Sequence, residues 1–176
     1  VCSLKIEGRV KSKEYVYTTI RQIRKALDEI PSTEKEREQM MVSFNRGYTL
    51  GHTYGKKENE LMNISAGNHQ GIDVGKVIGI EKNRIKIKVE KELYQGDGIR
   101  FVSKHGDAGC RINFLYDKNH KLVNRLPANS IGYVDRIDHV KPDSLIKKTV
   151  DANLEKEVTS IIKNGNRQIK VQAFIK

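Results

Sequence analysis

The spacing of apolar residues near the start of the chain predicts a strand followed by a helix. Leu4 and Ile6 alternate with charged neighbours until Gly8 breaks the pattern, which is typical of a short strand ending in a turn. Apolar residues then recur at helical spacing, at Val16, Ile20, Ile23, Leu27 and Ile30. Pro31 should end this helix, because proline has no N–H with which to continue the hydrogen-bond ladder.

Capping residues indicate where two helices begin. Ser12 can accept a hydrogen bond from a free backbone N–H, and Glu14 suits the positive end of a helix dipole. Thr33 and Glu36 have the spacing of a capping box. We therefore predict a second short helix that continues to about Val42.

After an irregular, glycine-rich connection over 49–70, the apolar period becomes two. Ile85, Ile87 and Val89 alternate with lysines, as in a strand with one buried face. The same pattern predicts strands at Val74–Ile80, Cys110–Tyr116 and Ile131–Val134. Tight turns are expected at Lys82-Asn83, Gly96-Asp97-Gly98 and Asp117–His120. Short strands at this spacing are typical of a small, closed β-barrel.

The last part of the chain has a different pattern. A helix is expected from Asp151 to about Lys163, and an alternating strand follows from Ile169 to Ile175. Because this strand has no evident partner in the sequence, we expect residues 144–176 to begin a further α/β domain.

The charge balance of the chain favours an anionic partner. The formal net charge is +11 and the sequence pI is about 9.6. A balance this basic is typical of proteins that bind nucleic acid. No run of five like charges occurs, however, and a solvated, generally basic surface would give the same composition.

Basic residues are densest on one predicted hairpin. They are Lys82, Arg84, Lys86, Lys88 and Lys91. Strand alternation places Lys86 and Lys88 on one face, where they could contact a phosphate backbone. The alternative is an edge strand that lysines protect against aggregation. Few aromatic residues interleave with these basic ones, so the sequence does not predict base stacking.

The chain has no pattern typical of a metal site or a nucleophilic triad. Cys2 and Cys110 are the only cysteines, and the histidines lack metal-ligand spacing, so we expect no metal in this chain. His105, Asp107 and Cys110 lie close in sequence, but a glycine-rich hairpin connection accounts for them. Apolar runs are too short for a membrane span and no signal peptide is evident, which favours a cytoplasmic protein without a membrane partner.

Several segments resemble the collagenase-like peptidases of family U-32, and they occur in the order of that family. The resembling segments are Ser3–Arg9, Phe44–Thr49, Gly75–Val77, Gly96–Ile99 and Lys148–Leu154. The first, with its Lys-Ile-Glu-Gly-Arg sequence, resembles the end of the family's catalytic barrel. The third and fourth resemble a β-barrel module appended after it.

The resemblance implies that this chain is an internal piece of a longer protein. Residues 1–48 would be the end of a (β/α) barrel of the TIM type, and the upstream part of that catalytic barrel would be a partner of this chain. The connection over 49–70, a small β-barrel over 71–143 and the start of a further α/β domain over 144–176 would follow. The expected fold class is α+β: a small closed β-barrel flanked by a strand–helix remnant of the TIM-type barrel and a C-terminal helix–strand piece.

The resemblance also carries expectations about chemistry. Family members are known as peptidases, some of them collagenases, and others are linked to hydroxylation of bases in ribosomal or transfer RNA. Several hold an iron–sulfur cluster on four cysteines. The long members, which this chain matches best, fall on the ribosomal RNA side. The cluster cysteines are expected upstream of this chain, so no cofactor is expected within it, and no ligand role is carried onto Cys2.

Two groups of polar residues are candidates for a site. Lys5, Glu7 and Arg9 would follow a barrel strand, whose C-terminal end faces the active site in this architecture; the alternative is that they pair to close the barrel. A glutamate can transfer a proton, and an arginine can hold a carboxylate or phosphate. Arg46, in the turn Asn45-Arg46-Gly47, could bind an anion or could fix a loop against its domain.

The leading functional hypothesis is an accessory region that helps a U-32-type enzyme hold RNA or another acidic substrate. One alternative is a region that docks the protein substrate of a true protease. Another is a structural spacer between the catalytic and C-terminal domains. In each case the chain itself is expected to be inactive, because most of the catalytic barrel would be absent.

Overall fold

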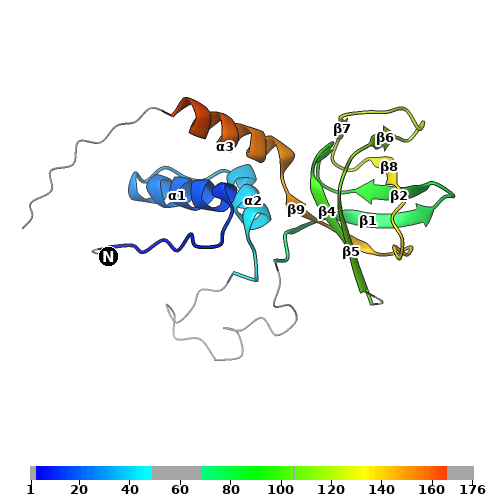
Figure 1. Ribbon diagram of the computed structural model, residues 1–176, viewed down its shortest axis with the longest axis horizontal. Coiled ribbons are helices and arrows are strands. Elements are labelled where there is room, and N and C mark those ends of the chain that lie inside the picture. Colours follow the sequence, from blue (N-terminus) through cyan, green and yellow to red (C-terminus); the bar gives the residue numbers. More distant parts are fainter. Residues whose placement is uncertain (1–2, 49–68, 105, 166–176) are drawn as a thin grey trace, which may run out of the picture.

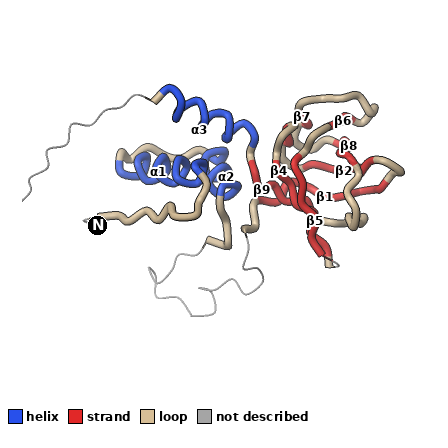
Figure 2. Tube along the Cα trace, in the orientation of Figure 1, coloured by secondary structure: helices blue, strands red, loops and turns tan. Residues whose placement is uncertain are grey.

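The computed structural model describes residues 3–48, 69–104 and 106–165. In this part of the chain the fold is α+β, as predicted, with the helices gathered on one side and the strands on the other (Figure 1, Figure 2). The helices are α1 (Lys13–Leu27), α2 (Glu34–Ser43) and α3 (Ala152–Asn164). None of the described helices is long and apolar enough to cross a membrane.

Antiparallel pairing joins seven of the described strands in the order β5-β4-β9-β1-β2-β8-β6, and β3 pairs separately with β7. The strands are β1 (Ile72–Ile80), β2 (Arg84–Val89), β3 (Leu93–Tyr94), β4 (Gly98–Ser103), β5 (Gly106–Arg111), β6 (Leu115–Asp117), β7 (Arg125–Leu126), β8 (Ile131–Asp135) and β9 (Leu145–Val150).

The closed barrel expected from the strand spacing is not found among the described residues. The edge strands β5 and β6 are not hydrogen-bonded to each other, so the ladder stays open. Residues 112–114 alone connect them, and a chain of this length spans at most about 14 Å. The edge strands β5 and β6 therefore lie near each other at this connection, but no backbone hydrogen bonds join them.

The core of the sheet follows the alternation seen in the sequence. Ile85, Ile87 and Val89 of β2 are fully buried, while Lys86 and Lys88 point away from the core. The buried cluster comprises Val74, Val77, Ile85, Ile87, Val89, Leu93, Ile99, Phe101, Ile112, Leu115, Leu126, Val134, Val140 and Ile146. Burial of this apolar surface is the main favourable term for the sheet.

Residues 144–176, expected to begin a further domain, contribute a strand to this sheet. β9 lies between β4 and β1, and its Ile146 is fully buried. The sheet therefore continues past residue 143, directly into α3. The predicted strand from Ile169 to Ile175 and most of the predicted connection over 49–70 lie outside the described residues.

A buried ion pair connects the sheet to α3. The carboxylate of Asp97, in the predicted glycine turn, accepts hydrogen bonds from the N–H groups of Tyr94 and Ala152, both at 2.9 Å. The Nζ of Lys148 on β9 lies 2.8 Å from the same carboxylate. Burial raises the pKa of Asp97, and the charge of Lys148 opposes that shift. The turn thus fixes the first residue of α3 relative to two strands.

The predicted helix caps are present. Ser12 accepts a hydrogen bond from the N–H of Tyr15, and Thr33 and Glu36 form a reciprocal capping box. α3 begins after Asp151, whose side chain accepts from the backbone of Asn153 and Leu154. Because caps satisfy the free N–H groups of a helix terminus with nearby side chains, they are local and readable in sequence.

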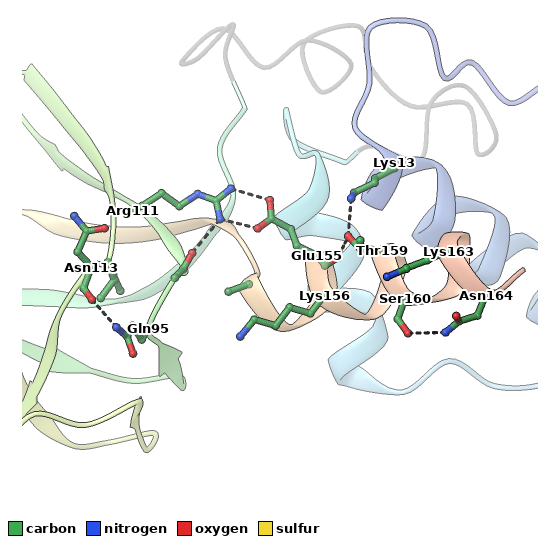
Figure 3. A pocket seen from close by; sticks show the side chains of 13 residues that line it. Lys13, Gln95, Arg111, Asn113, Glu155, Lys156, Thr159, Ser160, Lys163 and Asn164 are labelled. Atoms are coloured by element: carbon green, nitrogen blue, oxygen red, sulfur yellow. Dashed lines mark hydrogen bonds and ion pairs between the residues drawn. The ribbon is translucent and has the colours of Figure 1, made fainter.

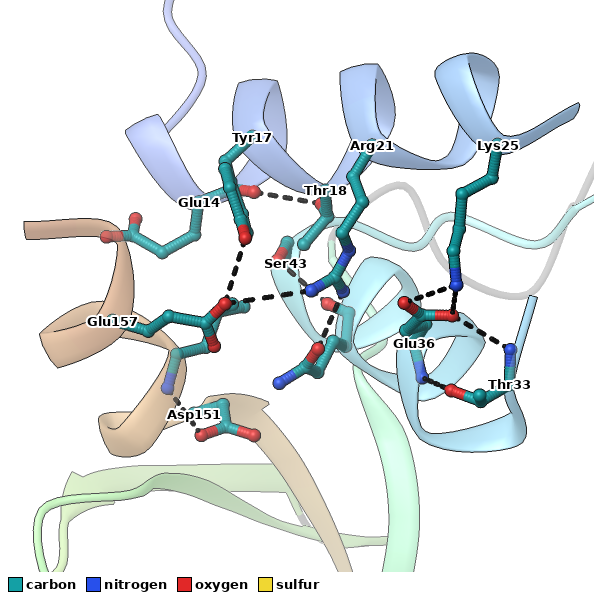
Figure 4. Close-up of polar contacts among 12 residues, drawn as sticks. Glu14, Tyr17, Thr18, Arg21, Lys25, Thr33, Glu36, Ser43, Asp151 and Glu157 are labelled. Carbon is teal, nitrogen blue, oxygen red and sulfur yellow. Dashed lines mark hydrogen bonds and ion pairs between the residues drawn. The ribbon is translucent and has the colours of Figure 1, made fainter. Parts of the chain in front are cut away.

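Polar contacts join α1 to the other two helices (Figure 4). The hydroxyl of Tyr17 on α1 donates to Glu157 on α3 at 2.9 Å. Arg21 of α1 donates to the side-chain oxygen of Gln39 on α2 at 2.7 Å, and Lys25 contacts Glu36 at the same distance. The polar side of α1 therefore faces the other two helices.

The predicted apolar face of α1 is correspondingly not buried. Ile20 and Leu27 remain 49% and 61% exposed, while the buried residue of α1 is Thr18. The predicted strand at Leu4 and Ile6 is also wrong, because this segment is not strand in the structure and both side chains are exposed. A strand needs a neighbour for its backbone hydrogen bonds, and the described residues supply none here.

His69 connects the end of α2 to the sheet. Its Nδ1 accepts from the N–H of Asn45 at 2.9 Å, so its Nε2 carries the proton and donates to the carbonyl of Val42 at 2.8 Å. The backbone carbonyl of Thr149 on β9 lies 3.3 Å from the same Nε2. Arg100 of β4 donates to the carbonyl oxygen of His69.

Candidate nucleic-acid interface

The outer side of β2 carries three of the predicted basic residues. Arg84, Lys86 and Lys88 alternate with fully buried core residues, so their side chains lie on the face opposite the core. In the described residues neither Lys86 nor Lys88 is paired with an acid. The antiparallel register places Lys86 opposite Tyr133 of β8.

Two tyrosines continue this row across the neighbouring strands. Tyr133 of β8 lies opposite Tyr116 of β6, so Lys86, Tyr133 and Tyr116 cross three adjacent strands. The guanidinium of Arg84 lies 3.7 Å from the centre of the Tyr116 ring, and the Nζ of Lys86 lies 5.7 Å from that of Tyr133. Both distances suit attraction between a cation and an aromatic face.

His120 completes the cluster from the turn after β6. Its ring stacks on Tyr133 with the centres 4.1 Å apart and the planes 25° from parallel. Its Nδ1 lies 2.9 Å from Nη1 of Arg84. Arginine has only donors, so Nδ1 is the acceptor and the imidazole is neutral with its proton on Nε2. We call Arg84, Lys86, Lys88, Tyr116, His120 and Tyr133 the basic–aromatic face.

The turn that carries His120 is held by its own backbone contacts. The carboxylate of Asp117 accepts from the N–H groups of Asn119 and Lys121 at 2.8 and 3.0 Å. The backbone N–H of His120 donates to the carbonyl of Asp117, and its φ is 62°. Asp117 is thereby engaged by the backbone, while Lys118 and Lys121 extend from the same turn and are exposed.

The acidic group closest in register to the basic–aromatic face is Asp135. It lies opposite Arg84, and the hydroxyl of Tyr116 donates to its carboxylate at 3.4 Å. The other charges of the face are positive. A face with cations and exposed ring surface can bind phosphates and stack on bases.

Two other residues of the predicted basic hairpin lie away from this face. Lys91 forms an ion pair with Glu38 of α2. Lys82 is exposed in the β1–β2 turn, where its backbone carbonyl accepts from Arg136 at 3.3 Å. The structure thus groups Arg84, Lys86 and Lys88 but uses Lys91 to hold the sheet against α2.

The turn around Arg46 is fixed to the sheet. The side-chain amide of Asn45 donates to the carbonyl of Gly71 at 2.9 Å, and its oxygen accepts from the N–H of Gly47 at 2.8 Å. The guanidinium of Arg46 lies 5.2 Å from the centre of the Phe44 ring. This geometry favours the prediction of a loop fixed against its domain over an anion-binding turn.

The candidate catalytic residues Lys5, Glu7 and Arg9 lie on the exposed segment before α1. The Nζ of Lys5 is 3.9 Å from the Glu7 carboxylate, and both side chains are largely exposed. Glu7 also accepts from the backbone N–H of Arg9 at 3.1 Å. These contacts are local, and the catalytic role of the three residues stays a prediction.

A groove of about 1010 Å³ runs between α3 and the sheet (Figure 3). Four of its lining residues are basic: Lys13, Arg111, Lys156 and Lys163. Arg111 binds both carboxylate oxygens of Glu155, at 2.6 and 2.7 Å, and these hydrogen bonds lower the pKa of Glu155. The groove can accept an anion, but none of its lining residues is aromatic, so it is the weaker candidate for nucleic acid.

The described residues contain no group of three or more His, Cys, Asp or Glu side chains placed to hold a metal ion. Burial raises the pKa of Cys110 to about 11, so its thiol is protonated at neutral pH and is a poor nucleophile. His105, the third member of the sequence cluster with Asp107 and Cys110, lies outside the described residues.

The aromatic half of this candidate interface is not predicted by the sequence. Tyr116, His120 and Tyr133 come from later strands and a turn, and sheet pairing brings them to β2. One signal in the sequence does point to Tyr133: it precedes Val134 in a predicted strand, so its side chain should lie on the face opposite that of Val134. Without the strand order, that alternation cannot tell which basic residues lie beside it.

Fold and site together define an α+β chain with a basic–aromatic face on its sheet. Residues 1–63 match the model of Peptidase family U32. The chain is 28% identical over 134 residues to the tRNA hydroxylation protein P of Haemophilus influenzae, and the match covers 70% of this chain. It is 25% identical over 183 aligned positions to the 23S rRNA 5-hydroxycytidine C2501 synthase of Escherichia coli, with 90% of this chain covered.

These matches confirm the resemblance of the chain to peptidase family U32. It spans 29% and 26% of the lengths of the two curated relatives. The crystal structure of the C-terminal domain of a Geobacillus thermoleovorans protein assigned to the U32 peptidases is similar at 14% identity. That match has a TM-score of 0.41 and covers 43% of this chain and 90% of the other.

Proposed function

We propose that this chain is an accessory, RNA-contacting region of a U32-family protein that hydroxylates RNA bases in the cytoplasm. The observation that carries the proposal is the basic–aromatic face, where Arg84 and Lys86 contact the rings of Tyr116 and Tyr133. The two curated relatives, whose names refer to tRNA hydroxylation and to 5-hydroxycytidine in 23S rRNA, support the choice of RNA. The catalytic step itself would lie in the rest of the parent protein.

The cofactor expected from the family resemblance does not fit this chain. A four-cysteine iron–sulfur cluster needs four thiolates, whereas the chain has two cysteines. One of them, Cys110, is half-buried with a raised pKa. We therefore assign the cluster to the rest of the parent protein and derive no step of the chemistry from it.

Fluorescence anisotropy with the 176-residue chain and a labelled hairpin RNA tests this proposal. We expect binding at about 50 mM salt that weakens steeply towards about 200 mM, because phosphate contacts release counterions. A labelled acidic peptide of the same length serves as the control for general charge attraction. Absence of RNA binding at the lower salt concentration, or equal binding of the peptide, would refute the proposal.

A further inference from the structure

We propose that the outer face of the His120 ring is a stacking platform for an unpaired nucleobase. The inference rests on the proposed function, because it names which part of an RNA the basic–aromatic face recognises. It points to single-stranded segments and loops, whose bases can be splayed out, in preference to a continuous duplex.

The His120 ring is held in place from two directions. Tyr133 supports its inner face at 4.1 Å between ring centres, and Arg84 donates to its Nδ1 at 2.9 Å. Tyr133 is only 4% exposed, whereas His120 is exposed. The imidazole therefore covers the tyrosine and presents its other face to solvent. A base placed there would extend the stack of Tyr133 and His120 by one ring.

Hydrogen bonds within the turn hold the platform in place. The turn is fixed by Asp117, which accepts two backbone N–H groups through its carboxylate. Since a held ring loses little conformational freedom on binding, stacking on it costs less than stacking on a mobile side chain. The exposed ring of His120 is therefore held on a fixed turn beside the basic strand β2.

Lysines of β2 and of the turn that carries His120 lie near the platform. Lys86 is on the neighbouring strand, with its Nζ 5.7 Å from the Tyr133 ring centre. Lys118 and Lys121 flank His120 in the same turn and are exposed. A single strand that stacks one base on His120 would therefore pass close to lysines of β2 and of the His120 turn. In a duplex the base faces are covered by their neighbours, so only the cations could contribute.

The test compares a labelled single-stranded RNA with the same strand in a blunt duplex, by anisotropy, for the intact chain and two matched variants. His120→Asn removes the ring but keeps a residue that tolerates positive φ. His139→Asn is the control, because His139 is also exposed with a φ of 69°. We expect His120→Asn to weaken single-strand binding by at least about fivefold, with the salt slope unchanged, and to leave duplex binding and His139→Asn unaltered.

A second measurement removes any dependence on the variant's folding. In NMR spectra of the intact chain, the ring protons of His120 should shift upfield on addition of the single strand. They should not do so with a strand of equal length that carries abasic sugars. An equal effect of both strands, or equal binding of His120→Asn and the intact chain, would overturn the stacking platform while RNA binding stands. If the intact chain binds neither RNA, it is the proposed function itself that fails.

Discussion

At the scale of single residues, Arg84 does two things that a lysine could not. Its planar guanidinium lies 3.7 Å from the centre of the Tyr116 ring while one N–H donates to His120. Lysine carries the same charge on a compact ammonium, which cannot stack and donate in the same geometry. The arrangement of the side chains in the basic–aromatic face therefore depends on the shape of Arg84 as well as on its charge.

Arg84→Lys should therefore weaken RNA binding even though the net charge is unchanged. We expect about a two- to fivefold loss, in keeping with the size of an exposed cation–π contact. Lys88→Arg is the matched control, because it also conserves charge and lies outside the ring contacts. Anisotropy titrations of the two variants decide the point: equal affinity in both would mean that charge alone matters at Arg84.

The buried pair of Asp97 and Lys148 shows the limit of reading residues from sequence. The two glycines and the aspartate correctly predict a turn, because turn chemistry is local. The burial of Asp97 does not follow from it, since one of its partners, Ala152, lies 55 residues later. That contact exists only after β9 has entered the sheet beside β4.

Removing one charge of this pair should destabilise the fold strongly. We expect Asp97→Asn to lower the free energy of unfolding by about 3 kcal/mol, which is the lower end of the range for a broken buried ion pair. The loss is at the lower end because the carboxylate of Asp151 lies 3.5 Å from Lys148 and still partly balances its charge. The double variant Asp97→Asn with Lys148→Met should recover much of the loss. Urea unfolding followed by circular dichroism measures both, and a single variant as stable as the parent chain would contradict the assignment.

At the scale of elements, the sequence predicted where the helices begin better than which side they bury. The caps at Ser12 and Thr33 depend on neighbours three residues away, and both are present. The buried side of α1 depends instead on α2 and α3, which it meets through Tyr17, Arg21 and Lys25. An apolar stripe predicts a helix, but it does not identify the surface that the helix packs against.

The contact between α1 and α2 should depend on pH through Glu36. Hydrogen bonds from Lys25 lower the pKa of Glu36 to about 2. A carboxylate with a depressed pKa in the folded state stabilises the fold above its unfolded pKa of about 4.3, and that contribution disappears as pH falls towards 2. Lys25→Met should thus be less stable than the parent chain at pH 7, and the gap should narrow as pH falls through this interval.

Thermal unfolding of Lys25→Met and of the parent chain between pH 7 and about 2 measures this stability gap. Arg37→Met is a suitable control, because Arg37 pairs with Glu34 within α2 and does not link the two helices. A constant stability gap between Lys25→Met and the parent chain across the acidic range would show that the Lys25–Glu36 pair is not its cause.

At the scale of the whole molecule, the candidate site is a product of strand order. Alternation in the sequence correctly placed Lys86 and Lys88 on the outer face of β2. It could not place Tyr116 and His120 beside them, because pairing of β2 with β8 and of β8 with β6 is non-local. The prediction that base stacking is unsupported followed from counting aromatic residues near the basic ones in sequence, whereas the fold brings the two groups together in space.

The molecule also presents a second basic surface, the groove along α3, which makes a matched comparison possible. The double variant Lys86→Gln/Lys88→Gln removes two cations from the basic–aromatic face. The double variant Lys156→Gln/Lys163→Gln removes two cations from the groove, where in the described residues neither lysine pairs with an acid. Both variants have the same net charge, so a general effect of charge would lower RNA binding equally.

The most direct test of RNA binding by the basic–aromatic face is the salt dependence of single-stranded RNA binding by the intact chain and these two variants. If the basic–aromatic face contacts two phosphates through Lys86 and Lys88, their loss should reduce the slope of log affinity against log salt by about 1.4. We expect that reduction for the face variant and a slope like that of the intact chain for the groove variant. An equal reduction in both, or a reduction in the groove variant alone, would contradict RNA binding by this face.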